Sequence, residues 1–271
     1  MAKYEALTLT WQEGVATLTL SCPEKRNAMT PALTRDFAAA LAAIRAEPTS
    51  RALVIAATGP VFCAGGDLAM LERMTGQAAA ENYREMRAFY MRYLDLLDLD
   101  IPTIAAIGGH AVGAGAALTL ACDIRILAAE AQLSFPFLDL GLHPGMGTTH
   151  LLPIIAGPSL AADLLLSGRR IGAAEALAQG LVSRVLPAAD VDTAALALAT
   201  ELAGRSVVAT QMAKRALVRP KLAGLDAALD DEATAQAHSY ASPELRAALA
   251  AIRERAHSGG STRPRGTPIA T

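Results

Sequence analysis

Net charge, cysteine and long apolar runs are all scarce in this 271-residue chain. Lys and Arg total 24 against 26 Asp and Glu, a formal net charge of -2, so no global field attracts nucleic acid or an anionic membrane. Cys22, Cys63 and Cys122 are an odd number at scattered spacings, which fits neither a disulfide framework nor a repeated metal-binding pair. No stretch approaches the roughly 20 apolar residues of a membrane span, and the first residues contain no signal-like run. We therefore expect a cytoplasmic protein without nucleic-acid or membrane partners.

Three common glycine-loop motifs are also missing, although residues 109–117 read GHAVGAGAA. A phosphate-binding loop needs Lys and then Ser or Thr after its last glycine, but Gly113 is followed by Ala114 and Gly115. The dinucleotide-binding fingerprint needs a third glycine where Leu118 stands. The motif G-x-S-x-G occurs nowhere, which argues against the commonest hydrolase design.

A metal site is not expected either. The seven-residue separation of His143 and His150 would place both on one face of a continuous helix, but Pro144 and Gly145 interrupt any helix that begins before them. No third ligand is evident. The sequence therefore predicts no bound metal.

The chain does contain enough apolar sequence, 52% of its residues, to bury one large core. Alternating patterns over residues 4–10 and 15–20 predict a β-hairpin. Thr30 and Pro31 supply a helix N-cap and a first-turn proline, so a helix is expected from there until Pro48 stops it.

The middle of the chain repeats an order of apolar strand, small-residue turn and helix. Strand-like residues 52–57 precede a glycine turn and a long helical region over 68–99 whose apolar side chains share one face. A strand over 103–107 leads into GHAVGAGAA, which we expect to be a turn followed by a helix, and a strand returns at 123–129. Beyond Pro144 helices dominate. This order predicts an α/β protein.

Two of the small-residue turns could present backbone N–H groups to a ligand. They are residues 62–68, FCAGGDL, and residues 109–117. A helix that begins at Gly113 or Ala114 has unsatisfied N–H groups at its first turn, and these attract developing negative charge. One such loop supplies half of an oxyanion hole, and the second loop would supply the other half.

At this point the chain resembles the crotonase superfamily, which includes enoyl-CoA hydratases and isomerases. Five segments carry the resemblance, in the family's order and spacing: KRNAM (25–29), VFCAGGDL (61–68), PTIAAIGGHAVGAGAALTLACDIRIL (102–127), GLHPGMGTTHLLP (141–153) and SGRRIGAAEALAQGLVSRVL (167–186). Each segment alone is a weak signal, but five in order are a strong one.

The resemblance implies an α/β fold built as a spiral of β-β-α units over residues 1–200. A C-terminal helical region over 201–257 would close the site and mediate trimer contacts, so a homotrimer or a dimer of trimers is expected. Residues 258–271, which are glycine, proline and polar residues, are expected to be a flexible tail.

The resemblance also implies the site. The main-chain N–H groups of Ala64 and Ala114 would bind the thioester oxygen of an acyl-CoA substrate and stabilise an enolate-like state. Contacts to the coenzyme A nucleotide and pantetheine would come from Lys25, Arg26, Ala28, Ala64, Gly66, Asp67 and Leu68. Coenzyme A is part of the substrate, and no other cofactor is implied. From residue type alone, Lys25 and Arg26 could equally be solvated surface cations, and Asp67 could simply hold the turn.

The chain departs from the family where hydratases carry two glutamates, since Ala117 and Phe137 stand at these positions. Some related family members carry an acid directly after a later proline. In this chain that position, after Pro144, is Gly145, so this acid is missing too. General acid–base groups contribute about a hundred- to ten-thousand-fold each, so their loss predicts weak hydration.

Few residues could replace the missing acids. Asp139 lies two residues beyond Phe137 and could act as an acid or base, or it could be a capping or ion-paired residue. His110 could act in the glycine turn, or be a turn or interface residue, and Cys63 has no identifiable base beside it.

Two functions remain open: an acyl-CoA lyase or isomerase that works through an enolate, and a non-catalytic acyl-CoA binding or assembly protein. A peptidase lacks its nucleophile and base.

Overall fold

The computed structural model describes residues 3–257, and within them ten strands form two sheets. The predicted flexible tail, 258–271, lies outside the described residues. The larger sheet has the order β1 (Leu7–Gln12), β2 (Val15–Leu20), β3 (Ala52–Ala57), β5 (Thr103–Ile107), β7 (Ile124–Ala128) and β10 (Arg184–Leu186). The smaller sheet has the order β4 (Val61–Cys63), β6 (His110–Val112), β8 (Gln132–Ser134) and β9 (Arg170–Gly172).

The chain passes between the two sheets three times in the same way. β3 is followed by β4, β5 by β6 and β7 by β8, so each pair begins in the larger sheet and ends in the smaller one. Helices follow each pair: α2 (Leu68–Met74), α4 (Ala114–Ala121) and, after the 3-10 turn η3 (Leu138–Leu140), α5 (Thr148–Ala156). This confirms the predicted spiral of β-β-α units. Because β4, β6 and β8 are parallel neighbours, their carboxyl ends and the loops that follow lie along one edge.

The N-terminal predictions are confirmed. β1 and β2 pair antiparallel across a tight turn in which Glu13 and Gly14 both have positive φ, 50° and 80°, the conformation that suits the twist of a hairpin. The helix α1 (Pro31–Ala46) begins where predicted, because the Thr30 hydroxyl accepts the Leu33 N–H at 3.2 Å.

The predicted long helix over 68–99 is divided into α2, α3 (Ala79–Leu94) and the 3-10 turn η2 (Asp95–Asp98). Thr75 to Ala78 form the break, and the Asn82 side chain joins its two sides by donating to the Met74 carbonyl at 3.0 Å. The predicted apolar face of α3 is confirmed, since Met86, Phe89, Tyr90 and Tyr93 are buried.

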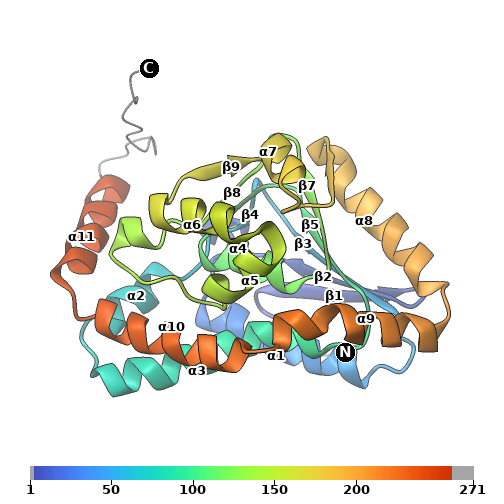
Figure 1. The fold of residues 1–271 in the computed structure, drawn as a ribbon, viewed down its shortest axis with the longest axis horizontal. Helices are drawn as coiled ribbons and strands as arrows, with labels where there is room; N and C mark the ends of the chain where they lie inside the picture. The colour runs from blue at the N-terminus through green and yellow to red at the C-terminus, as the bar shows by residue number, and fades with distance from the viewer. Residues whose placement is uncertain (1–2, 258–271) are drawn as a thin grey trace.

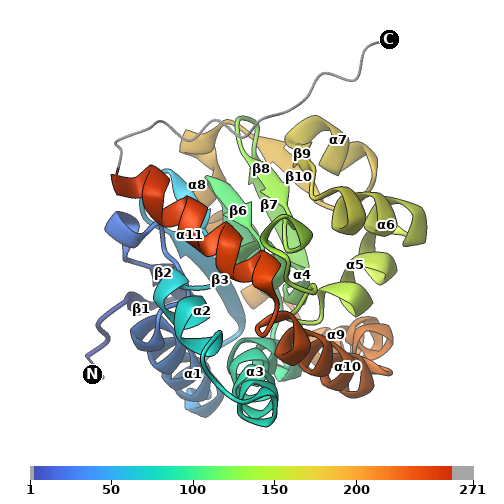
Figure 2. The same ribbon diagram turned by 90° about the vertical axis from the view of Figure 1, so that its left-hand side faces the viewer.

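The remaining helices cover the sheets and the edge where the loops lie. They are α6 (Pro158–Ser167), α7 (Ala173–Ala178), α8 (Ala188–Ala203), α9 (Val207–Leu222), α10 (Leu225–Ser239) and α11 (Pro243–His257), with a 3-10 turn η1 (Pro23–Lys25) near the N-terminus. Figure 1 shows α3 and α10 side by side along the lower edge, with α8 against the larger sheet. In Figure 2, α11 crosses the molecule over α2.

One hydrophobic core joins the predicted parts of the chain, from Ala6 to Leu249. The predicted boundary at residue 200 falls inside α8, which packs against β3, β5 and β7. Of the helices within residues 3–257, none has the length and apolarity that crossing a membrane requires.

Candidate active site

Two loops meet at the edge of the smaller sheet. Residues 64–67 connect β4 to α2, and Gly113 connects β6 to α4. A methyl group built on Gly65, whose φ is +88°, would lie 2.7 Å from the Val112 carbonyl oxygen and 3.2 Å from the Ala114 nitrogen. The two backbones are therefore in contact, as the pair of small-residue turns predicts. Only a residue without a side chain fits at position 65.

Small residues also let α4 approach β4. A methyl group on Gly115 would lie 2.4 Å from the Cys63 carbonyl oxygen. The Cys63 thiol is fully buried and donates to the Asn27 carbonyl at 3.0 Å, and burial raises its pKa to about 12. Cys63 is consequently a buried thiol that packs between the loops, and not a nucleophile.

The backbone N–H groups of these loops are not equally free. The Ala64 N–H donates to the Arg26 carbonyl at 3.0 Å, so the predicted donor at Ala64 is already used within the protein. Gly66 and Ala114 line the adjoining cavity, and within residues 3–257 neither of their N–H groups has an acceptor. Gly66, predicted only to contact coenzyme A, thus replaces Ala64 as the free donor beside Ala114.

The structure brings the two predicted coenzyme A segments together. Met29 N–H donates to the Gly65 carbonyl at 2.8 Å, next to the hydrogen bond from Ala64 N–H to the Arg26 carbonyl. Lys25 and Arg26 are exposed beside this pairing, Ala28 is half-buried, and Leu68 at the start of α2 lines the cavity.

Two residues of these segments behave differently from the sequence-based expectations. Asp67 occupies the N-cap position of α2 without a side-chain capping bond, so it does not hold the turn by that route. Asn27, which the motif analysis did not single out, has a φ of 51°, and its side chain accepts from Cys22 N–H and donates to the Thr58 and Val61 carbonyls. Asparagine tolerates this left-handed backbone, and that tolerance was the available sequence signal.

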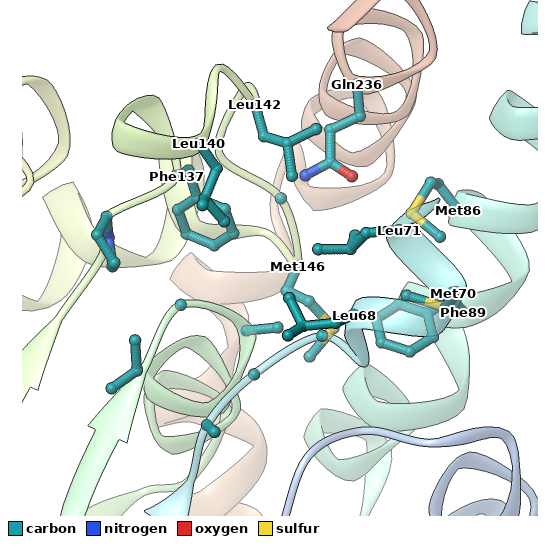
Figure 3. A pocket seen from close by; sticks show the side chains of 18 of the residues that line it. Leu68, Met70, Leu71, Met86, Phe89, Phe137, Leu140, Leu142, Met146 and Gln236 are labelled. Carbon is teal, nitrogen blue, oxygen red and sulfur yellow. The ribbon is translucent and has the colours of Figure 1, made fainter. Parts of the chain in front are cut away.

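A cavity adjoins Gly66 and Ala114, the residues with the free N–H groups. Its walls come from α2, α3, the segment after β8, and α10 (Figure 3). Apolar side chains dominate: Leu68, Met70, Leu71, Met86, Phe89, Phe137, Leu140, Leu142 and Met146. Among the described residues that line it, the polar side chains are Tyr90, Gln236 and Tyr240, and none is a carboxylate or a cation.

The positions of the missing glutamates are apolar in three dimensions as well. Phe137 follows β8, and its ring carbons lie 4.0 Å from a methyl group built on Gly113. Ala117 is completely buried in α4 and does not line the cavity. An aromatic ring therefore faces the loop where an acid was the family expectation.

Asp139 does not lie in the cavity. It is exposed on η3, and its carboxylate oxygens lie 2.9 and 3.0 Å from a methyl group built on Gly168. The predicted acid–base role gains no support from this position, because Asp139 is not among the residues that line the cavity with Gly66 and Ala114.

The histidines have structural partners. His110 is in β6, not in a turn, and its Nδ1 accepts the Gln132 N–H at 3.1 Å. His143 Nδ1–H donates to the Pro144 carbonyl at 2.7 Å, and His150 Nε2–H donates to the Lys221 carbonyl at 2.9 Å. Within the described part of the chain no group of three or more His, Cys, Asp or Glu could hold a metal ion.

Three cavity residues escaped the sequence analysis. Tyr90 was predicted only as part of the packing face of α3, whereas Gln236 and Tyr240 come from the C-terminal helical region. Burial raises the pKa of both tyrosines, so both hydroxyls keep their protons. The Tyr240 hydroxyl donates to the Met86 sulfur at 3.3 Å, and Gln236 Nε2 donates to the His143 carbonyl at 2.8 Å.

Cations gather at the opposite end of α4. Lys221 donates to the Leu120 and Cys122 carbonyls at 3.0 and 2.9 Å, and buried Arg125 also donates to Cys122 at 2.8 Å. Burial, and then the charge of Arg125, lowers the pKa of Lys221 to about 8. These donors satisfy the carboxyl end of α4, while its amino end, which carries partial positive charge, faces the cavity.

Comparisons with known proteins identify relatives over nearly the whole chain. The sequence model of the enoyl-CoA hydratase/isomerase family matches residues 10–258. A Mycobacterium tuberculosis protein named "Probable enoyl-CoA hydratase EchA14" is 37% identical over 94% of this chain and 100% of its own length. The crotonyl-CoA hydratase of Syntrophomonas wolfei is 29% identical over 93% of this chain and 96% of its own. An enoyl-CoA hydratase/isomerase structure from Xanthobacter autotrophicus superposes with a TM-score of 0.86 at 27% identity, covering 95% of this chain and 96% of that one.

Proposed function

Because the chain belongs to the enoyl-CoA hydratase/isomerase family of the crotonase superfamily, we propose that it is an enzyme that binds an acyl-CoA thioester and stabilises its enolate. The observation that carries the proposal is the pair of free backbone donors, Gly66 N–H and Ala114 N–H, on loops in direct contact beside an apolar cavity.

The two donors suit the oxygen of a thioester. When a proton or another group leaves the α-carbon, negative charge moves onto this oxygen. Fixed N–H donors then gain strength without having to reorient, and one such donor is typically worth about a hundred- to a thousand-fold in rate. The amino end of α4, at Ala114, adds partial positive charge at the same place.

The substrate's coenzyme A portion would lie over the paired segments outside the cavity. Lys25 and Arg26 are exposed there and can bind phosphate oxygens. The pantetheine would pass Ala28 and Leu68 and carry the thioester to Gly66, with the acyl group in the apolar cavity.

The walls of the cavity do not favour hydration by two carboxylates. Activating a water molecule needs a base, and no carboxylate or histidine lines the cavity within residues 3–257. An isomerase reaction also needs a base, for the α-proton, whereas a lyase reaction in which another group leaves the α-carbon does not. We therefore place an enolate-forming lyase reaction ahead of an isomerase reaction and of efficient hydration. The same observation supports a second candidate, a non-catalytic acyl-CoA binding protein.

One experiment separates these functions. The purified protein is mixed with a panel of saturated and enoyl-CoA thioesters in D2O; binding is measured by calorimetry, and α-proton exchange and product formation by NMR. Binding with exchange or turnover supports the enzyme, whereas binding alone supports the non-catalytic protein. If no thioester binds, both proposals are wrong.

The oligomeric state is part of the same proposal. Several large apolar side chains of α6 and α9 are exposed in the single chain: Leu166, Val208, Met212 and Leu217. Such a surface favours burial between subunits, and we expect a trimer or a dimer of trimers by light scattering. A monomer at micromolar concentration would contradict this.

A further inference from the structure

Met86 lines the cavity on the side opposite the loop of Ala114. The ring carbons of Phe137 lie 4.0 Å from a methyl group built on Gly113, the residue before Ala114, so Phe137 marks the side of the N–H donors. Figure 3 shows Met86, on α3, across the cavity from Phe137. An acyl chain that fills the cavity, with its thioester oxygen at Ala114, therefore runs toward Met86.

The side chain of Met86 is held in place. A methionine side chain normally adapts to its surroundings, because it has three rotatable bonds. Met86 is buried, however, and its sulfur accepts the hydrogen of the Tyr240 hydroxyl at 3.3 Å. Burial raises the pKa of Tyr240, so the phenol keeps the proton that it donates. Rotation of Met86 away from an entering chain would break this hydrogen bond.

The helices behind Met86 are also held together. Met86 belongs to α3 and Tyr240 is the C-cap of α10, and these two helices pack side by side (Figure 1). Arg87 of α3 forms an ion pair with Asp230 of α10 at 2.6 Å, and the Tyr83 hydroxyl donates to the same carboxylate at 3.0 Å. Moving the wall at Met86 would therefore separate two joined helices.

The space in front of Met86 is small. The cavity has a volume of about 130 Å³. An apolar protein cavity of roughly 150 Å³ holds a benzene molecule, which has about the size of a six-carbon group. A longer unbranched acyl chain would meet Met86, or its end would stay outside the cavity in water.

We propose that Met86, held by Tyr240, limits the length of the acyl group, and that the preferred substrate is the CoA thioester of a hydrocarbon chain of about six carbon atoms. A hydrocarbon chain suits the cavity because leucine, methionine and phenylalanine side chains dominate its wall, and no charged side chain of residues 3–257 lines it. The proposal rests on the proposed function, since it takes the thioester oxygen to lie at Gly66 and Ala114.

The test measures by calorimetry the affinity of saturated acyl-CoA thioesters of increasing length: butyryl-, hexanoyl-, octanoyl- and decanoyl-CoA. Each methylene group that leaves water for the cavity should tighten binding about fourfold. In the unaltered protein we expect the affinity to rise from butyryl- to hexanoyl-CoA and to rise no further with octanoyl- and decanoyl-CoA.

Three variants locate the limit through the affinity ratio of octanoyl-CoA to hexanoyl-CoA. Met86→Ala removes the side chain beyond Cβ and should raise this ratio from about one to about ten. Tyr240→Phe frees the Met86 sulfur without removing the wall, so the ratio should rise about two- to fourfold. Met74→Ala is the matched control, because Met74 is also buried but does not line the cavity, and its ratio should stay at about one.

Distinct results would overturn the two proposals. The length limit is wrong, and the proposed function stands, if affinity rises steadily through decanoyl-CoA in the unaltered protein. The same holds if the ratio stays at about one in folded Met86→Ala, or if Met74→Ala raises it equally. An unchanged ratio in Tyr240→Phe would show that Tyr240 does not hold Met86. If no thioester binds, the proposed function fails and the length limit fails with it.

Thermal unfolding confirms that each variant is folded. If Met86→Ala does not fold, Met86→Val decides the question, because valine fills more of the space behind the wall. Its ratio should rise about fourfold, the effect of about one more buried methylene group, and a ratio of about one would refute the length limit.

Discussion

Replacing Gly65 by alanine should separate the two free N–H donors. The methyl group would lie 2.7 Å from the Val112 carbonyl oxygen and 3.2 Å from the Ala114 nitrogen. Both are backbone atoms and cannot rotate away, so the loop after β4 must move from α4. Gly66 and Ala114 would then no longer point at one oxygen.

The cost of Gly65→Ala has two parts. Its φ of +88° is unfavourable for a residue with a side chain, which costs about 1–2 kcal/mol, and overlap with packed atoms typically costs about 1–3 kcal/mol more. Gly180→Ala is a matched control, because Gly180 has a φ of +71° and no atom lies within 4 Å of the added methyl group. The control should lose only the first part.

Urea unfolding measures the stability of both variants. Hydrogen bonds from the two donors should lower the infrared frequency of the thioester carbonyl in bound acyl-CoA, so this band reports on the donor pair. We expect Gly65→Ala to be less stable than Gly180→Ala and to lose this lowering of the frequency, with turnover about a hundred- to a thousand-fold lower. Equal stability of the two variants would refute the steric argument. A normal carbonyl band and normal turnover in Gly65→Ala would refute the assignment of the donors.

Three further predictions address the other parts of the site. Lys25→Ala and Arg26→Ala should each weaken acyl-CoA binding, measured by calorimetry, about two- to fivefold, and by less at high salt. A thioester of the same acyl group with a short thiol that has no phosphates should bind to these variants and to the unaltered protein with equal affinity. Ala117→Glu with Phe137→Glu should lower stability but raise crotonyl-CoA hydration, and a folded, ligand-binding double variant without that gain would show that more than two acids is missing. Lys221 has a pKa of about 8 in the folded protein, against an ordinary 10.5. Between these two pH values the unfolded chain binds more protons than the folded chain, so the free energy of unfolding rises with pH, by up to about 1.4 kcal/mol per pH unit. Lys221→Met should flatten this slope in urea titrations from pH 7.5 to 10, and parallel slopes would contradict the pKa assignment.

Much of the fold was predictable because its signals are local. The Thr30 N-cap and Pro31 predict the start of α1 within one residue, and the apolar run over 52–57 is β3. The failures were also local. β6 has three residues, too few to show alternation, and it lies inside the glycine-rich segment that was expected to be a turn. Such a strand forms because β4 and β8 pair with it on both sides.

The candidate site divides in the same way. Small residues at 65 and 115 mark where backbones must approach, which sequence alone can indicate. Which N–H group remains free cannot be read from residue types, since it depends on the Arg26 carbonyl lying against Ala64. The position of Asp139 could not be predicted either, because it is near Phe137 in sequence and yet is exposed on η3.

The sequence by itself determined the family resemblance, which implied the β-β-α order, and it showed two small-residue loops and no acid at positions 117 and 137. These follow from residue types and their spacing along the chain. Only the tertiary structure decided that the Gly66 N–H is free and that the side chains of Tyr90 and Gln236 both pack against Gly145. The first fact depends on the Arg26 carbonyl, which lies against Ala64. The second depends on helices α3 and α10, which are far apart in sequence and become neighbours only when both bury their apolar faces against the same core.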